Sequence, residues 1–334
     1  MTWDVHRLPR AEGRTFLITG GNAGIGYFVA EQLATTGATV VIAGRSAPKG
    51  EAATASIRSR VPDARVRHIP LDLADPASIE RSVYALDTET LDAVVLNAGV
   101  LLDDPPRRET AAGHELMFAT NHLGHFALTA RLAPLLHAAP AARVVTTGSF
   151  AARGERLDLD DLQSTRDYRP KRTYGRSKLA QTLFALELDR RLRAAHSTTI
   201  SVVSHPGGAL DALTPSRAPL HVRTTAQRLR GLPLGLLLQG KEAGAWPTVR
   251  AVLDPAVRGG RLIGPRVFGL RGRPRFEPVR EHFADRDTAR RLWTASAALT
   301  GTDPAPGAGS VSAGPSPSPA GTPRRTERPC RASR

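Results

Sequence analysis

A glycine-rich turn near the start of the chain lies between two segments of different type. Residues 14–20 (RTFLITG) are apolar and β-rich, which predicts a buried strand, and residues 27–36 have the spacing of a helix. The turn between them carries Gly20, Gly24 and Gly26. Glycines let a backbone approach a pyrophosphate closely, and the free amides at the start of the helix face that anion. The sequence therefore predicts a dinucleotide-binding turn.

The end of the second predicted strand indicates which dinucleotide is expected. Residues 38–43 (ATVVIA) are followed by Gly44-Arg45-Ser46, and residues 36–50 contain no acidic residue. An NAD site uses a carboxylate here for the ribose hydroxyls, whereas an NADP site uses a cation for the 2′-phosphate. We therefore expect NADP(H), with Arg45 at the 2′-phosphate. NAD(H) stays an alternative, because an ordinary surface arginine after a strand would give the same pattern.

Strands and helices alternate along most of the chain. Further strands are predicted at residues 66–71, 91–96, 143–147, 199–204 and 261–263, and helices after Asp75-Pro76 and at residues 112–136, 173–195 and 242–253. This alternation is typical of a single-domain, doubly wound parallel sheet, the Rossmann fold, with helices on both faces. Such sheets bind ligands at the carboxyl ends of their strands. The candidate residues at these ends are Asp72, Asn97, Gly99, Ser149, Pro206 and Gly207.

A tyrosine and a lysine four residues apart open the helix predicted at residues 173–195. Residues i and i+4 share a helix face, so Tyr174 and Lys178 project the same way. A phenol titrates near ~10 and a lysine near ~10.4, and a nearby cation lowers the pKa of the phenol. The pair therefore predicts a general acid/base that works near neutral pH. Taken alone, such a pair is more often a half-buried tyrosine beside a surface lysine, so the interpretation depends on the rest of the chain.

In their order along the chain, these motifs resemble the short-chain dehydrogenase/reductase superfamily over about residues 13–300. The resemblance implies cofactor contacts from Gly20, Asn22, Gly24, Ile25, Gly26, Asp72, Asn97, Gly99, Tyr174, Lys178, Pro206 and Gly207, and a catalytic tetrad of Asn121, Ser149, Tyr174 and Lys178. In that tetrad, Tyr174 exchanges a proton with the substrate oxygen, to which Ser149 hydrogen-bonds. Lys178 holds the nicotinamide ribose and lowers the pKa of Tyr174, and Asn121 holds a water that connects Lys178 to solvent. The implied activity is the NADP(H)-dependent interconversion of a carbonyl and an alcohol.

Finer features resemble the retinol dehydrogenase and protochlorophyllide reductase-like branch. They are the insertion between Ser149 and Tyr174 with Leu159-Asp160-Asp161-Leu162, the run Ser177-Lys178-Leu179-Ala180, His205 before Pro206-Gly207, and Arg290-Arg291-Leu292-Trp293. Substrate selection is expected in residues 208–240, where the stretch 231–238 (GLPLGLLL) would line an apolar mouth for a lipophilic small molecule. Ordinary packing of a loop helix explains that stretch equally well.

Four residues depart from the pattern of the superfamily, of which Leu96, where a second asparagine is frequent before Asn97, is a mild change. Ala23 stands where a serine is usual in the glycine turn, Gly148 where a first serine is common, and Asp211 where a threonine often contacts the cofactor. A carboxylate near a pyrophosphate is repulsive unless it turns away. The alternative function is therefore a cofactor-binding sensor or interaction protein with weak or no catalysis.

The chain carries a formal net charge of +15, and its only lysines are Lys49, Lys171, Lys178 and Lys241. Arginines cluster between residues 258 and 280. Such a basic surface can bind nucleic acid or an anionic membrane surface. No zinc-finger spacing or basic zipper accompanies it, so we expect no specific nucleic acid and interpret it as a solvated, arginine-rich surface.

Other sequence features bear on disulfides, metal sites, membrane spans and domain organisation. Cys330 is the only cysteine, and His122 and His125 lack the glutamate of a zinc-protease helix, so neither a disulfide framework nor a metal site is expected. No apolar run is long enough to span a membrane, and residues 1–14 lack the apolar core of a signal peptide, so a soluble, cytoplasmic protein is expected. The expected organisation is an N-terminal extension at residues 1–12, the Rossmann domain at 13–300 and a disordered Pro/Gly/Arg-rich tail at 301–334. The sequence leaves homo-oligomerisation open.

Overall fold

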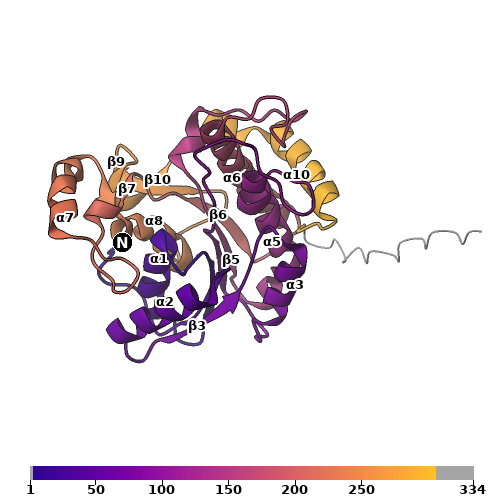
Figure 1. Ribbon diagram of the computed structural model, residues 1–334. Helices are drawn as coiled ribbons and strands as arrows, with labels where there is room; N and C mark the ends of the chain where they lie inside the picture. Colours follow the sequence, from indigo (N-terminus) through magenta and orange to yellow (C-terminus); the bar gives the residue numbers. More distant parts are fainter. Residues whose placement is uncertain (1–2, 306–334) are drawn as a thin grey trace, which may run out of the picture.

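An eight-stranded sheet forms the centre of the structure, a computed structural model that describes residues 3–305 (Figure 1). Its strands are β1 (Thr15–Thr19), β2 (Thr39–Gly44), β3 (Arg65–Pro70), β4 (Ala93–Leu96), β5 (Arg143–Thr147), β6 (Ile200–Ser204), β9 (Leu262–Val267) and β10 (Arg271–Glu277). They lie in the order β3-β2-β1-β4-β5-β6-β9-β10. All neighbours are parallel except β10, which runs antiparallel to β9. The predicted Rossmann fold is confirmed.

The strands are apolar on both sides because helices cover both faces of the sheet. Phe16 and Ile18 of β1 face one helical layer and Leu17 faces the other, as expected for side chains that alternate across a strand. The first layer contains α1 (Gly24–Ala34), α2 (Ala47–Arg60) and α8 (Lys241–Leu253), and the second contains α3 (Pro76–Tyr84), α5 (Gly124–Ala138), α6 (Pro170–Ala194) and α10 (Arg286–Thr300) (Figure 1). Asp75 caps α3, as its position before Pro76 predicted.

The long helix predicted at residues 112–136 is interrupted. It consists of α4 (Leu116–Phe118), a π-helical turn η1 (Ala119–Leu123) and α5. Gly124 packs so closely on the backbone carbonyl of Leu73 that a Cβ at this position would overlap it. The π turn contributes Thr120 to the cleft at the carboxyl ends of the strands, and π bulges are frequently found at functional sites.

Shorter elements complete the chain. They are the 3-10 turns η2 (Phe150–Gly154), η3 (Asp211–Leu213) and η4 (Leu232–Leu236), the helices α7 (Thr225–Gly231) and α9 (Glu281–Ala284), and the two-stranded pair β7 (Ala209–Leu210) and β8 (Gln239–Gly240). Neither α10 nor β10 was predicted. Within residues 3–305, we find no helix with the length and apolarity that crossing a membrane requires.

Both ends of the described chain pack against the domain. Val5 and Ala11 of the predicted N-terminal extension are buried. At the other end, the indole N–H of Trp293 donates to Asp303 at 3.1 Å, and Pro304 is buried. The beginning of the predicted tail, residues 301–305, is thus part of the folded unit, and the rest of that prediction lies outside the described residues.

Candidate active site

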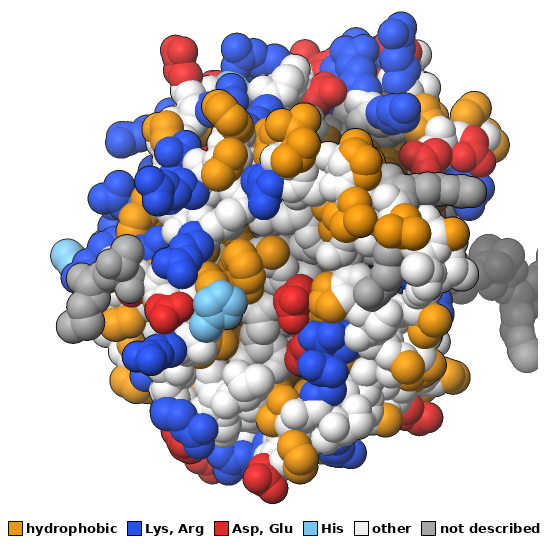
Figure 2. Space-filling view, turned by 90° about the vertical axis from the view of Figure 1, so that its left-hand side faces the viewer, with side chains coloured by type: hydrophobic (Ala, Val, Ile, Leu, Met, Phe, Trp, Pro, Cys, Tyr) orange, Lys and Arg blue, Asp and Glu red, His pale blue; other side chains and the backbone are white. Residues whose placement is uncertain are grey.

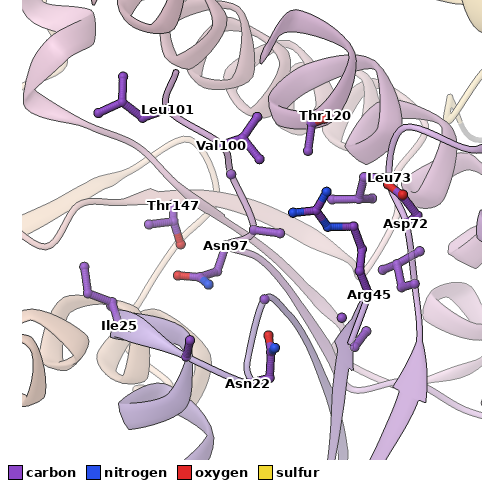
Figure 3. Close-up of a pocket in the computed structure, with 18 of the residues that line it drawn as sticks. Asn22, Ile25, Arg45, Asp72, Leu73, Asn97, Val100, Leu101, Thr120 and Thr147 are labelled. Atoms are coloured by element: carbon purple, nitrogen blue, oxygen red, sulfur yellow. The ribbon is translucent and has the colours of Figure 1, made fainter. Parts of the chain in front are cut away.

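A cleft of about 520 Å³ lies at the carboxyl ends of β1, β2, β4 and β5 (Figure 3). The predicted site residues that line it are Gly20, Asn22, Gly24, Ile25, Arg45, Asp72, Asn97, Gly99, Ser149, Tyr174, Lys178 and Pro206. Gly26, Asn121 and Gly207 are not part of this lining. The structure therefore brings most residues that the sequence singled out into one cleft.

The glycine turn has the shape of an anion cradle. Gly20 and Gly24 have φ of +67° and +59°, conformations that side-chain-bearing residues rarely adopt. A Cβ at Gly26 would lie 2.5 Å from the carbonyl oxygen of Gly20 and would overlap the Asn97 amide, so only glycine lets α1 begin this close to β1. Ala23 precedes α1 and provides no side-chain cap, which leaves the first amides of the helix for a ligand. These features fit the pyrophosphate of a dinucleotide.

Basic and hydroxyl groups meet at one end of the cleft. The guanidinium of Arg45 extends across the cleft towards the region of Asp72 and Leu73 (Figure 3). Ser46 and Lys49 line the same cleft, and Ser46 caps α2 by accepting the Lys49 amide at 3.4 Å. Lys49 was not predicted as a site residue, although its position one helical turn after Arg45, within the acid-free residues 36–50, was a usable signal.

The Asn97-Ala98-Gly99 turn joins the ends of β1 and β4. The amide of Asn97 donates to the carbonyl oxygen of Thr19 at 2.9 Å. The hydroxyl of Thr19 accepts from the backbone amides of Asn97 and Ala98, at 2.9 and 3.0 Å. These bonds hold the floor of the cleft in one arrangement.

Asn121 is fully buried in the π turn and does not line the cleft. Its side chain accepts from the Val100 amide at 2.7 Å and donates to the Val100 carbonyl at 3.0 Å and to the Ser177 hydroxyl at 2.9 Å. Asn121 therefore fixes Val100, which does line the cleft. Its expected role in holding a water stays a prediction.

Tyr174, Ser149 and Lys178 lie together at the other end of the cleft. Burial raises the pKa of Tyr174, and a hydrogen bond with Ser149 partly opposes that shift. Burial also lowers the pKa of Lys178 to about 7. Burial thus opposes the lowered pKa that we expected for the phenol. The Lys178 ammonium donates to the Thr147 carbonyl at 2.6 Å and to Gln181.

A buried polar chain that the sequence did not reveal supports Lys178. The amide nitrogen of Gln181 donates to the Leu96 carbonyl at 3.2 Å and lies 3.1 Å from Nδ1 of His125. Nε2 of His125 lies 2.9 Å from the Thr19 hydroxyl. The chain thus connects the Lys178 ammonium with the turn after β4. His122, the other histidine of the rejected zinc pattern, bonds the Ser296 hydroxyl at 2.7 Å.

Asp211, which departs from the family pattern, forms two ion pairs away from the cleft. Asp211 turns to Lys241 at 2.6 Å and Arg223 at 3.3 Å, and these contacts hold its pKa below the usual range despite partial burial. Its carboxylate is outside the lining of the cleft. Whether Asp211 weakens cofactor binding stays a prediction. Gly207 has φ of +69° and packs against the Leu270 carbonyl, which fixes the turn after Pro206.

A doubly wound parallel sheet with this cleft defines a dinucleotide-binding α/β protein. A family model for the short chain dehydrogenases matches residues 14–160. Polyprenol dehydrogenase of Mus musculus is 38% identical over 88% of this chain and 86% of its own length. Retinol dehydrogenase 13 of Homo sapiens is 35% identical over 87% of this chain and 86% of its own. The chain belongs to the short-chain dehydrogenase/reductase family, whose members are oxidoreductases that act on small molecules with NAD(P)(H).

Solved structures agree with this assignment. A protein from Mycobacterium paratuberculosis is 35% identical, with a TM-score of 0.72 over 91% of this chain and 99% of that one. The RhlG/NADP active-site complex of Pseudomonas aeruginosa is 26% identical, with a TM-score of 0.56 over 76% of this chain and 94% of that one.

Proposed function

We propose that this protein is an NADP(H)-dependent oxidoreductase that interconverts a carbonyl and an alcohol on a lipophilic small molecule, with Tyr174 as general acid/base. The observation that carries the proposal is the single cleft in which the glycine turn, the Arg45–Lys49 end and the Tyr174–Ser149 pair occur together. A dinucleotide is long enough to reach from a pyrophosphate cradle to groups on either side of it. The distribution of charge and hydroxyl groups therefore argues for one orientation of the ligand.

The preference for NADP(H) is supported by the two cations at one end of the cleft. A 2′-phosphate next to Arg45 and Lys49 would form charge-assisted hydrogen bonds, and the Ser46 hydroxyl is a further donor. A ribose that carries only hydroxyls would leave this positive charge unpaired. The RhlG complex, whose name includes NADP, is consistent with this preference.

The proton chemistry is assigned to Tyr174. The bound dinucleotide supplies or accepts the hydride. In the direction of carbonyl reduction, Tyr174 donates its proton to the substrate oxygen while Ser149 donates a hydrogen bond to the same oxygen. A phenol whose pKa is raised by burial stays protonated at neutral pH, as an acid for this step must. The Lys178 ammonium has three donors, of which Thr147 and Gln181 take two, and the third is available to a hydroxyl group in the cleft.

A lipophilic substrate is supported by the apolar part of the cleft wall. Val100 and Leu101 line the cleft, and Leu101 is about half exposed at its edge. The relatives named for polyprenol and retinol are named for lipophilic alcohols. We therefore propose that this cleft, with its apolar wall, binds an apolar ketone, aldehyde or alcohol.

The test is turnover of NADPH on a panel of apolar and polar carbonyl compounds, read by nicotinamide absorbance, with Tyr174→Phe as the variant. We expect oxidation of NADPH with apolar members of the panel and a rate reduced at least ~100-fold in the variant, since general acid catalysis contributes about that much. Tyr168→Phe, a tyrosine outside the cleft lining, is the matched control and should keep its rate.

Binding and turnover separate this proposal from its alternative. NADPH binding is measured by nicotinamide fluorescence on the same preparations. Tight binding without turnover on any compound would contradict the enzymatic role and favour a cofactor-binding sensor. Equal turnover in wild type and Tyr174→Phe would contradict the assignment of Tyr174.

A further inference from the structure

Large apolar side chains gather on the outside of the segment between β6 and β10. Of the twelve exposed large hydrophobic side chains in the described part of the chain, eight lie here. We call these eight the leucine face: Val222, Leu229, Leu232, Leu234, Leu236, Leu237, Val267 and Phe268. Their exposed fractions run from 43% for Val267 to 81% for Phe268. The apolar mouth expected from the stretch 231–238 is thus turned outward, because none of its leucines lines the cleft.

The leucine face is one surface built from two parts of the chain. Leu229 belongs to α7, and the leucines that follow belong to η4 and the residues after it. Val267 ends β9, and Phe268 lies in the turn between β9 and β10. Arg271, which pairs with Val267 in the sheet, donates to the carbonyl oxygens of Gly235 and Leu236. Arg271 therefore holds the β9–β10 turn against η4. Single exposed apolar residues are ordinary on a protein surface, but a contiguous group marks an interaction site.

The leucine face is bordered mainly by cations, and Glu277, the carboxylate beside Gly269, is paired with Arg153 at 3.2 Å. Residues 212–241 and 255–276 contain no aspartate or glutamate. Arg223, Arg266 and Arg273 are exposed at its border. The nearest carboxylate on the loop, Asp211, already pairs with Arg223 and Lys241. Figure 2 shows this side of the molecule, with orange side chains in the upper half and many blue side chains and fewer red ones around them.

This face also adjoins the candidate active site. Leu238, at the end of the stretch, contacts Gly208, and Gly269, next to Phe268, lies close to Phe150. Phe150 directly follows Ser149, and Gly208 follows Pro206-Gly207, so both contacts lead to one end of the cleft. A molecule that enters or leaves through an apolar layer pressed on the leucine face would arrive beside Ser149.

We propose that the leucine face docks the protein on the surface of an anionic lipid bilayer, with the leucines and Phe268 in the acyl boundary and the bordering arginines at the headgroups. Apolar side chains surrounded by cations match such a surface in both chemistry and charge. A second copy of this chain would bring the bordering arginines of the two copies together, and like charges at close range repel. The inference goes beyond the proposed reaction, since docking needs neither cofactor nor Tyr174.

The test is co-sedimentation of the full-length protein with lipid vesicles. We expect binding to phosphatidylcholine vesicles that contain about 30% phosphatidylglycerol, at least ~10-fold weaker binding to pure phosphatidylcholine, and weakening by high salt. Leu236→Ser combined with Phe268→Ser should reduce binding at least ~10-fold, because it removes two apolar side chains from the acyl boundary. Arg266→Gln combined with Arg273→Gln should reduce only the part of the vesicle binding that depends on phosphatidylglycerol.

Control measurements distinguish a specific loss of vesicle binding from a loss of folding and from the effect of a substitution elsewhere on the surface. Tyr84→Ser changes a side chain that is 92% exposed on α3, at the opposite side of the molecule in Figure 1, and should leave vesicle binding unchanged. Each variant should keep the thermal midpoint and NADPH affinity of the wild type, measured in parallel. Equal sedimentation with and without the anionic lipid, or unchanged binding of the Leu236/Phe268 variant, would overturn the proposal. So would a change from dimer to monomer in that variant without any vesicle binding by the wild type, which would assign the face to a second copy.

Discussion

The ammonium of Lys178 donates to the side-chain carbonyl of Gln181, three residues further along α6. Gln181 is itself held by its bond to the Leu96 carbonyl at the end of β4. An ammonium that is almost fully buried, with its pKa lowered to about 7, is sensitive to each acceptor around it. Gln181 is therefore a positioning residue: it is anchored to the sheet and orients Lys178, and it does not contact a substrate itself.

Gln181→Met tests this relationship, because it preserves the length of the side chain and removes the acceptor. We expect a further fall in the pKa of Lys178 and a loss of about 10- to 100-fold in kcat/KM for carbonyl reduction, as expected when a hydrogen bond to a charged group is removed. The measurement is the pH dependence of kcat/KM. In the wild type, the rate should fall as pH rises through about 7, where Lys178 loses its proton. Gln181→Glu should move that limb to higher pH, because a carboxylate stabilises the ammonium.

Gln32→Met is the matched control for that experiment. The Gln32 amide donates to the Glu242 carbonyl at 3.0 Å, away from the cleft lining. It should leave the pH profile unchanged. If Gln181→Met keeps both the rate and the position of the limb, Gln181 does not position Lys178.

Gly26→Ala is expected to damage dinucleotide binding. The added methyl group would overlap the Asn97 amide and lie 2.5 Å from the Gly20 carbonyl, so the turn and the floor of the cleft must move apart. We expect NADPH to bind at least ~10-fold more weakly, and overpacking to cost about 1–3 kcal/mol of unfolding free energy. Gly154→Ala adds a methyl group with nothing within 4 Å and should change neither quantity. Fluorescence titration with NADPH measures the first quantity, and urea unfolding the second.

The parts of the fold that the sequence predicted are those stabilised by simple burial. The strands β1, β2, β4 and β5 are apolar on both faces, and such runs are recognisable without tertiary information. Strand β10 (RGRPRFE) was missed because it is an arginine-rich edge strand that exists through its antiparallel pairing with β9. The interruption at η1 was missed as well, because no break in the apolar spacing of residues 112–136 marks it, and Gly124, at its end, packs on Leu73 from a distant part of the chain.

In the candidate active site, too, the features carried by the local sequence were predictable and those that depend on tertiary contacts were not. The glycine turn and the Tyr174–Lys178 pair carry their spacing in the local sequence, so both were predictable. Gln181 and His125 act through contacts between α6, η1 and the sheet, which join residues about 56 positions apart in sequence. No local pattern distinguishes them from ordinary core residues.

The Arg45–Lys49 end is expected to set the preference between the two nicotinamide dinucleotides. Arg45→Gln and Lys49→Gln should each weaken NADPH binding about 10-fold or more, because each removes a charge-assisted contact to the 2′-phosphate. NADH binding should stay within about 2-fold of wild type, since its ribose carries no phosphate there. Titrations with both dinucleotides measure the two affinities. Lys171→Gln, an exposed lysine on α6, is the control, and parallel losses for NADPH and NADH would argue against a phosphate contact.

Two buried histidines are expected to make the fold sensitive to acid. Burial lowers the pKa of both His122 and His125 from 6.5 to about 3, so both stay neutral in the folded protein where the unfolded chain takes up protons. Since the unfolded state then binds more protons, the unfolding free energy is at its full value above pH 6.5 and falls as pH decreases towards 3. Burial of Lys178 lowers its pKa from 10.5 to about 7, so the unfolding free energy also falls as pH decreases from 10.5 to 7.

His122→Gln isolates one of these contributions. A glutamine can still reach the Ser296 hydroxyl but cannot take up a proton, so the slope of unfolding free energy against pH should decrease by up to ~1.4 kcal/mol per pH unit between about pH 4 and 6. Urea unfolding at pH 5 and pH 7 measures the slope, and the exposed His137→Gln should leave it unchanged. A variant that is less stable than wild type by the same amount at both pH values would show that His122 contributes packing alone. A variant whose stability relative to wild type is higher at pH 5 than at pH 7 would instead identify the neutral, buried imidazole as a source of the acid sensitivity.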